Sequence, residues 1–383
     1  MNIQKGETPV RSWLTEPLSA DVLRSVDRLC RAEDVQRVAL MPDVHLANEV
    51  CVGVAMATSR LIYPAAIGSD IGCGMAAVVF HAEATLLADE SAAARVLAGL
   101  YRYVPAMKLR QDVAPDFLPA HLQQAALSAS RLDKLKNRDG RYQLGTLGRG
   151  NHFVEFQADD QGRLWLMVHS GSRGMGQAIA AHHLQRAREQ NPTGKLLAVD
   201  SEMEPGQAYL NDAAWAIAYA EENRLAIVAA VERLFQELFG VAMDHQTLIH
   251  SDHNHVRRET HDGQDYWVHR KGALPAACDA PGVIPGSMGT ASFHVIGRGV
   301  SAALCSSSHG AGREYSRSEA ARRIPTQRLE REMQGVWFDH RHASSLRDEA
   351  PTAYKDIHAV MRAQRELTRI VRELRPILSY KGV

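Results

Sequence analysis

Residues 248–255 place three histidines and an aspartate within eight positions, in the order Leu-Ile-His-Ser-Asp-His-Asn-His. Three upstream segments carry the same kinds of donor: Asp70-Ile-Gly-Cys73, Gly150-Asn-His152 and His169-Ser-Gly-Ser-Arg-Gly174. A single histidine or cysteine is usually an ordinary surface or core side chain. Carboxylate, thiolate and imidazole recurring together, beside glycine or after an apolar run, is instead typical of a metal site assembled from distant loops.

The donors of these segments form one candidate ligand set: Asp70, Cys73, His152, His169 and His253. Ligand softness alone favours zinc or another late first-row ion, because manganese usually prefers carboxylate and water. The alternative for Cys73 is that it is a small buried apolar residue.

Residues 306–313, Ser-Ser-Ser-His-Gly-Ala-Gly-Arg, have a different character. The flanking glycines expose the ring of His309 and bare backbone N–H groups to an oxyanion, while Arg313 offers a planar fork of donors to phosphate. A histidine presented in this way could be a nucleophile toward phosphorus. The alternative is a polar turn that carries a solvated histidine.

Other basic or glycine-containing segments are weaker signals, including residues 269–273 and 285–290. A basic cluster near a glycine turn could follow a nucleic-acid backbone, although such a run is more often a solvated helix face; its members are Arg131, Lys134, Lys136, Arg138 and Arg141.

Apolar patterning predicts the elements that must position these groups. Short apolar runs beside turn residues predict strands at 38–41, 52–57 and 75–80. Helical spacing predicts helices over 86–103, 118–135 and 208–239, and an amphipathic helix from 354 through 374. We therefore predict an α+β fold with a single domain over residues 1–383.

A hairpin is predicted between residues 151 and 169, because strand-like runs flank the turn sequence Ala-Asp-Asp-Gln-Gly-Arg. A turn centred between Asp160 and Gln161 would place His152 directly opposite His169. Opposed residues have Cβ atoms about 4.5–5.5 Å apart, so the two imidazoles could share one ion. A register shifted by one residue would send them to opposite faces.

Bulk composition narrows the protein class. The chain has 383 residues, 45% of them hydrophobic, with 44 basic and 44 acidic residues. No global positive field exists, so any nucleic-acid contact must come from local patches. The five cysteines form no CxxC pair, and we find no signal-like or membrane-spanning apolar run. We expect a cytoplasmic protein that does not enter a membrane.

Taken in order, the motifs resemble the RtcB family of GTP-dependent RNA ligases. The matching segments span nearly the whole chain: residues 41–45, 68–74, 145–155, 169–174, 253–254, 268–273, 285–292, 309–313, 354–357 and 381–382. The resemblance implies one RtcB-like domain with packed central β-sheets surrounded by helices.

The resemblance also implies roles for individual residues. Two Mn²⁺ ions, in place of the zinc that softness favours, would be held by Asp70, Cys73, His152, His169 and His253. His309 would be the guanylylated residue, and Arg173 would hold an RNA phosphate. The implied GTP contacts are Asn151, Glu155, His253, Asn254, Pro285, Ser287, Met288, His309, Gly310, Ala311, Gly312, Tyr354, which would stack on guanine, and Lys381.

The implied reaction joins an RNA 3′-phosphate or 2′,3′-cyclic phosphate to a 5′-hydroxyl through a GMP-histidine intermediate, in tRNA or rRNA repair or splicing. An archease-like activator is a further implied partner. One alternative is a metal-dependent cyclic phosphodiesterase or 3′-end guanylyltransferase that never seals. Another is a non-catalytic RNA-binding relative, which the presence of every expected ligand and of the nucleophile disfavours.

Three departures from the family pattern bear on these expectations. Gly72 precedes the cysteine where many members have Asn, and residues 46–51 replace the usual aromatic and glycine residues in a loop near the RNA end. Glu155 should face away from His152 under strict strand alternation. A bulge or a late strand start is needed if both serve one site.

Overall fold

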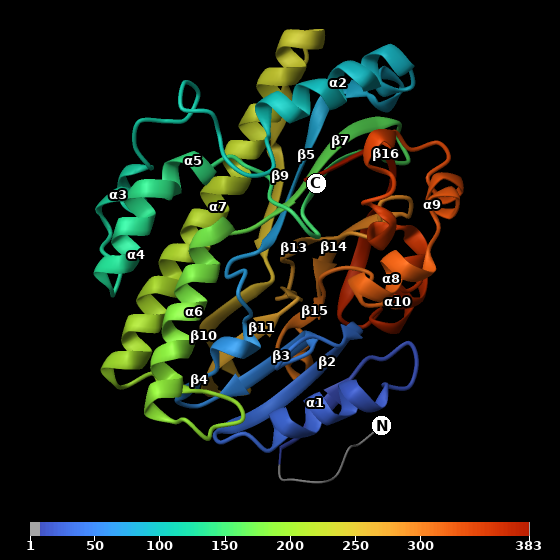
Figure 1. The fold of residues 1–383 in the computed structure, drawn as a ribbon. Helices are drawn as coiled ribbons and strands as arrows, with labels where there is room; N and C mark the ends of the chain where they lie inside the picture. The colour runs from blue at the N-terminus through green and yellow to red at the C-terminus, as the bar shows by residue number, and fades with distance from the viewer. Residues whose placement is uncertain (1–7, 383) are drawn as a thin grey trace.

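The computed structural model describes residues 8–382, whose strands form two larger sheets (Figure 1). The five-stranded sheet has the order β1 (Val10–Ser12), β2 (Val35–His45), β3 (Val52–Thr58), β11 (Gln264–Lys271) and β10 (Asn254–His261). The seven-stranded sheet has the order β13 (Pro281–Ile284), β14 (Ser292–Gly297), β16 (Thr368–Lys381), β6 (Phe153–Ala158), β7 (Arg163–Ser170), β5 (Gly74–Glu83) and β9 (Met243–Asp252). Two small pairs complete the strands: β12 (Ala273–Pro275) with β15 (Ser306–Ser308), and β4 (Leu61–Ile62) with β8 (Val199–Asp200).

Helices flank these sheets on two sides, as Figure 1 shows. One flank carries α3 (Ala120–Gln124), α4 (Ser130–Leu135), α5 (Arg141–Gln143), α6 (Arg173–Gln190) and α7 (Glu204–Phe239), and the other carries α8 (Arg317–Arg323), α9 (Thr326–Glu332) and α10 (Ile357–Ala363). The remaining two are α1 (Ala20–Cys30) and α2 (Glu90–Tyr103). Within the described residues, none of these helices combines the length and apolarity that a membrane crossing needs.

The largest core lies where α2 and α7 pack on the seven-stranded sheet. Phe80 of β5, Phe156 of β6 and Phe235 of α7 stack in this core, with ring centroids 4.2 to 6.1 Å apart. Burying each such side chain contributes roughly 1.5–3 kcal/mol. This core anchors β5, β6 and β7, the strands whose ends carry the candidate metal ligands.

Several predicted elements are confirmed. The strands expected at 38–41, 52–57 and 75–80 lie within β2, β3 and β5, and the helix expected over 208–239 is α7. The helix expected over 86–103 is α2, which begins at Glu90 after a short 3-10 turn. The α+β prediction is therefore correct.

The continuous helix predicted over 118–135 is wrong, because α3 ends at Gln124 and α4 begins only at Ser130. The backbone N–H and hydroxyl of Ser128 both donate to the buried Asp212 carboxylate, at 2.8 and 2.6 Å. These bonds hold the intervening segment against α7, which a continuous helix could not do. The leucines at 118, 122 and 132 are nevertheless buried, as the periodicity implied.

The helix predicted from 354 through 374 is also wrong in its second half. Helix α10 ends at Ala363, and from Thr368 the chain forms β16. This strand pairs first with β14 and then with β6 in the middle of the seven-stranded sheet. Long-range strand pairing of this kind leaves no signature in the local spacing of apolar residues. Ile370, which the prediction placed on the apolar face of the helix, is 46% exposed.

The hairpin is confirmed as β6 and β7, but its predicted register is wrong by one residue. Phe153, and not His152, lies opposite His169. His152 still approaches His169, because it precedes the first residue of β6 and is not bound by strand alternation. The late strand start also leaves Glu155 on the face of Phe153 and His169.

Candidate active site

The candidate ligands lie where the chain crosses from one large sheet to the other. Strand β9 of the seven-stranded sheet ends at Asp252, His253 follows, and β10 of the five-stranded sheet begins at Asn254. The His253 N–H donates to the carbonyl of Cys73 at 2.8 Å, and the Gly72 N–H donates to the carbonyl of Asn254 at 2.7 Å. The Asp70–Cys73 loop and the crossing segment are therefore held together by their backbones.

Five side chains from four segments converge at this crossing. Cys73 Sγ lies 3.2 Å from His169 Nε2 and 3.5 Å from His152 Nε2. The Nε2 atoms of His169 and His253 are 3.3 Å apart, and Asp70 Oδ2 is 2.8 Å from His152 Nε2. Two groups have all their donor atoms within 4.8 Å of one another: Cys73 with His169 and His253, and Cys73 with Asp70 and His152. The Cys73 thiol belongs to both groups, and each group has the three donors that could hold a metal ion.

Burial sets the protonation of these ligands. It lowers the pKa of His169 and of His253 well below the ordinary value, with neighbouring imidazoles adding to the effect. Burial also raises the pKa of the Cys73 thiol well above its usual range, and Asp70 adds to that shift. For Asp70, burial is outweighed by His152 and Arg173, so the pKa of the carboxyl is lowered. Neutral imidazoles, an ionised carboxylate and a thiol that only a cation would deprotonate form a donor set that fits divalent first-row metals.

Two buried residues of α7 brace the loops that present these ligands. Asn223 accepts from the Gly145 N–H at 2.7 Å and donates to the Ser170 hydroxyl at 2.9 Å. Arg224 donates to the carbonyls of Gly72 and Ser170 at 2.7 and 2.9 Å. Sequence reasoning missed both, because their partners lie more than 50 positions away in the sequence.

His309 lies beside the metal ligands and is oriented by Asp43 of β2. Its ring centroid is 4.7 Å from that of His253. Asp43 Oδ2 accepts from His309 Nδ1 at 2.7 Å and from the His309 backbone N–H at 3.1 Å. This pairing assigns the proton to Nδ1 and leaves the Nε2 lone pair available. Asp43 is fully buried, so it is a positioning residue that the sequence analysis did not identify as such.

A cavity of about 360 Å³ opens beside His309 and brings together all of the residues expected to contact the nucleotide. Its lining includes Asp70, Cys73, Asn151, Glu155, His169, His253, Asn254, Pro285, Ser287, Met288, His309, Gly310, Ala311, Gly312, Tyr354 and Lys381. His152 and Arg173 are not part of the lining. Arg173 lies behind it, with Nη1 3.1 Å from His152 Nδ1.

The buried carboxylate of Glu349, in the cavity wall, contacts four polar side chains around the cavity. Sequence reasoning did not identify this residue. Glu349 accepts from the Tyr354 hydroxyl at 2.8 Å and pairs with Arg313, Arg317 and Lys381. Burial alone would raise the pKa of Glu349, but Lys381 and Arg317 lower it to about 2. Glu349 therefore stays ionised and holds Tyr354 and Lys381 at the cavity.

Gly72, one of the departures from the family pattern, is required by packing. Its φ is +75°, and a Cβ atom there would lie 2.8 Å from the Ile217 backbone of α7. The close approach of α7 thus excludes a side chain at this position. The divergent loop at 46–51 connects β2 to β3, and His45 at its start lines the cavity.

Under the role that the family resemblance implies for His309, replacing Asp43 with Asn or Ala should slow the attack of His309 on the GTP phosphorus without unfolding the protein. The ring would lose the ionised acceptor that selects its tautomer, an effect worth roughly 10²–10⁴-fold in rate. We expect this drop in the rate at which the protein becomes labelled by α-labelled GTP. Asp27→Asn, an exposed change on α1, should leave the rate unchanged. Wild-type labelling rates in both Asp43 variants would refute the positioning role.

Comparisons with known proteins agree with the arrangement of these motifs. The model of the family described as "tRNA-splicing ligase RtcB" matches residues 26–123 and 117–382. The chain is 34% identical to the RNA-splicing ligase RtcB of Escherichia coli K12, over 98% of this chain and 97% of that protein. It is 30% identical to the RNA-splicing ligase RtcB of Mycobacterium tuberculosis, over 89% and 96% of the two chains. With the tRNA-splicing ligase RtcB of Thermococcus kodakarensis it shares 34% identity over 65% of this chain and 61% of that one.

Proposed function

Because the chain belongs to the RtcB family, we propose that it is an RNA ligase that joins a 3′-phosphate or 2′,3′-cyclic phosphate end to a 5′-hydroxyl end, using GTP. Residues 1–383 would act as one domain, since β9 and β10, the strands on either side of His253, belong to different large sheets. A role in repair or splicing of tRNA or rRNA fits the names of the relatives.

One observation carries this proposal: an imidazole oriented by a buried aspartate lies next to a shared-thiolate donor set, at the wall of one cavity. His309 Nε2 has no hydrogen-bond partner among residues 8–382, so its lone pair is free to attack. The cavity size suits a nucleotide-sized ligand.

The proposed chemistry uses His309 as a covalent nucleophile. Its Nε2 forms a bond to the α-phosphorus of GTP while the bond to the β-phosphate oxygen breaks and pyrophosphate leaves. If the RNA end is a 2′,3′-cyclic phosphate, hydrolysis first opens it to a 3′-phosphate. An oxygen of this 3′-phosphate then takes the GMP from His309. Finally the 5′-hydroxyl of the second end attacks the activated 3′-phosphate and releases GMP.

Other residues would hold the reactants. Two divalent ions, Mn²⁺ in this proposal, would be held by Asp70, Cys73, His152, His169 and His253, and would neutralise charge on the transferring phosphates. Asn151, Glu155, Ser287 and Lys381 would contact the nucleotide, with Tyr354 against the guanine. The Arg173 guanidinium would give up its contact with His152 and bind an RNA phosphate instead.

The pH dependence of nucleotide binding should report on Glu155. Burial raises the pKa of this carboxyl from 4.5 to about 8, against the opposing effects of Gln157 and Lys381. A raised pKa means that the acid is mostly protonated at pH 6 and mostly ionised only above pH 8. Guanine N–H groups need the ionised acceptor, so labelling at subsaturating GTP should rise by up to about tenfold per pH unit below 8 and then level off.

Glu155→Gln provides the control, because an amide does not titrate. The ratio of wild-type to Glu155→Gln labelling rates cancels the ionisation of GTP and of bound metal. A ratio that is flat between pH 6 and 9 would show that Glu155 does not act on the nucleotide as an ionised acceptor.

Product analysis on a nicked stem-loop tests sealing itself. The substrate carries a 2′,3′-cyclic phosphate and a 5′-hydroxyl at the nick, and is incubated with GTP and Mn²⁺, with and without an archease-like activator. The proposal predicts a full-length ligated RNA. The alternative, an enzyme that does not seal, predicts an open 3′-phosphate or a guanylylated 3′ end and no ligated product under either condition. The divergent loop at 46–51 would then be the structural reason for the loss of sealing.

A further inference from the structure

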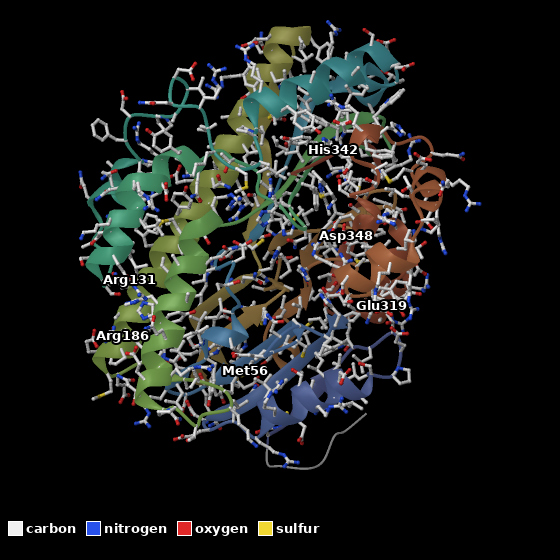
Figure 2. The ribbon with its side chains drawn as sticks, in the orientation of Figure 1. Met56, Arg131, Arg186, Glu319, His342 and Asp348 are labelled. Carbon is white, nitrogen blue, oxygen red and sulfur yellow. The ribbon has the colours of Figure 1, made fainter. Side chains whose placement is uncertain are left out.

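A surface groove lies between α4 and α6, away from the cavity that holds His309. Its lining includes basic residues of α4 and of the turn that follows it, Arg131, Lys134 and Arg138, and residues of α6, Ala178, Ala181 and Gln185. Leu132 and Leu135 of α4 complete the lining. Figure 2 labels Arg131 on α4 and Arg186 near the end of α6, at the same edge of the molecule. The small alanine side chains leave the basic side chains room to line an open channel.

The structure divides the basic cluster found in the sequence into buried and available members. Lys136 is buried, pairs with Asp133 at 2.9 Å and donates to the Ala125 carbonyl at 2.6 Å, so it is a structural residue. Arg141 donates to the Pro115 carbonyl and to the Tyr142 hydroxyl. These two therefore do not line the groove.

The remaining cations are exposed, and two of them have no counter-ion. Arg131 and Lys134 make no ion pair within 4.0 Å with any carboxylate of residues 8–382. Arg138 pairs with the neighbouring Asp139, which also binds Lys108. The two unpaired cations differ in this from Arg24 and Arg31, at α1 and its C-cap, which each pair with an aspartate. Unpaired cations beside an open channel suit a ligand that brings its own negative charge.

Helix α6 connects this groove to the candidate active site. It begins at Arg173, whose Nη1 contacts His152, and the Gly174 N–H donates to Gln143 at 2.9 Å. Gly174, Ala178, Ala181 and Gln185 recur at helical spacing and therefore lie on one face of α6. From Gly174 to Gln185 this face extends about 16 Å along the helix.

We propose that the α4–α6 groove binds phosphodiesters of the RNA substrate several nucleotides away from its reacting end. This inference rests on the proposed function, since it assumes that the ligand of the active site is RNA. Arg131, Lys134 and Arg138 contact backbone phosphates, so the groove adds affinity for long RNA without selecting its sequence. The alanine floor lets the strand lie close to α6.

The test compares two triple variants that each remove three positive charges. The first is Arg131→Gln with Lys134→Gln and Arg138→Gln. The matched control is Arg24→Gln with Arg28→Gln and Arg31→Gln, which are exposed arginines of α1 and its C-cap with partners inside the protein. Binding of a 20-nucleotide RNA with a 3′-phosphate is measured by fluorescence anisotropy over a range of salt concentrations, and the protein–GMP adduct is measured without RNA.

The groove variant should lower the slope of log K against log salt by roughly 2, since each single-strand phosphate contact contributes about 0.7. Its KM for a long nicked RNA should rise while kcat and GMP labelling stay at the wild-type level. The α1 control should behave as wild type. An unchanged salt slope and KM in the groove variant, or an equal loss in the control, would overturn the proposal.

The two proposals fail in distinguishable ways. A wild-type protein that binds RNA with a groove-dependent slope, yet forms no GMP adduct, would contradict the proposed ligase chemistry and leave the groove standing. Normal GMP labelling and sealing, with an RNA-binding salt slope that the groove variant does not change, would contradict the groove proposal and leave the ligase chemistry standing. Labelling of the groove variant also shows that its fold is intact.

Discussion

His309→Ala should abolish sealing and GMP labelling together. The variant removes the only atom that the account assigns as nucleophile, and nearby groups cannot replace it because Asp43 and His253 are themselves fixed by contacts with the ring or the metal donors. Loss of a covalent nucleophile typically costs on the order of 10⁴–10⁶ in rate. We expect ligation of the nicked stem-loop to fall below detection, measured as ligated product per enzyme.

His358→Ala is a suitable control, since this exposed histidine at the start of α10 lies outside the cavity lining. It should ligate at the wild-type rate. Metal content of His309→Ala should remain normal, because His309 is not among the converging donors. Residual sealing within tenfold of wild type would show that another group carries the GMP.

Cys73→Ala should remove metal from both donor groups at once. The thiol belongs to each group, so no complete set of three donors remains in either one. Mutating a residue that only hydrogen-bonds to a metal ligand typically lowers metal affinity about 10–100-fold. Removing Cys73, a donor that both groups share, should lower metal affinity by more than that. Titration with Mn²⁺, Zn²⁺ and Co²⁺ should show both sites weakened, and the thiolate-to-cobalt absorption of the wild type should disappear.

Cys51→Ala is the matched control, because Cys51 is equally buried but packs in the core beneath β2 and β3. Its metal stoichiometry should equal that of the wild type. The same titration ranks the ions, which matters because ligand softness favours zinc whereas the family resemblance favours manganese. Full occupancy of two ions in Cys73→Ala would contradict the shared-thiolate arrangement.

The sequence alone identified the side chains that the structure brings together at the crossing of the two sheets. Cys73 lies between two glycines, Asp70 lies two positions from Gly68 and Gly72, and the three histidines lie at or next to strand ends. Such positions are visible in local patterning. His152 and His169 are neighbours as predicted, although the hairpin has a different register, because His152 lies outside β6. The close approach of the His152 and His169 rings therefore does not follow from strand pairing.

The residues that sequence reasoning missed act through long-range contacts. Asp43 reaches His309 across 266 positions, and Lys381 reaches Glu349 from the last strand. The C-terminal strand itself was predicted as helix, because its pairing with β6 and β14 is set by distant residues. Local periodicity carries no information on such pairing. Gly72 was seen as a departure, but only the backbone of α7 explains it.

The protein–GMP adduct tests the central claim most directly. Wild-type protein is incubated with GTP and Mn²⁺, digested without acid, and its peptides are mapped by mass spectrometry. We predict one GMP per chain, bound to the peptide that contains residues 306–313 and assigned to His309 by fragmentation. An adduct on another residue, or none with Mn²⁺, Co²⁺ and Zn²⁺ alike, would contradict the account.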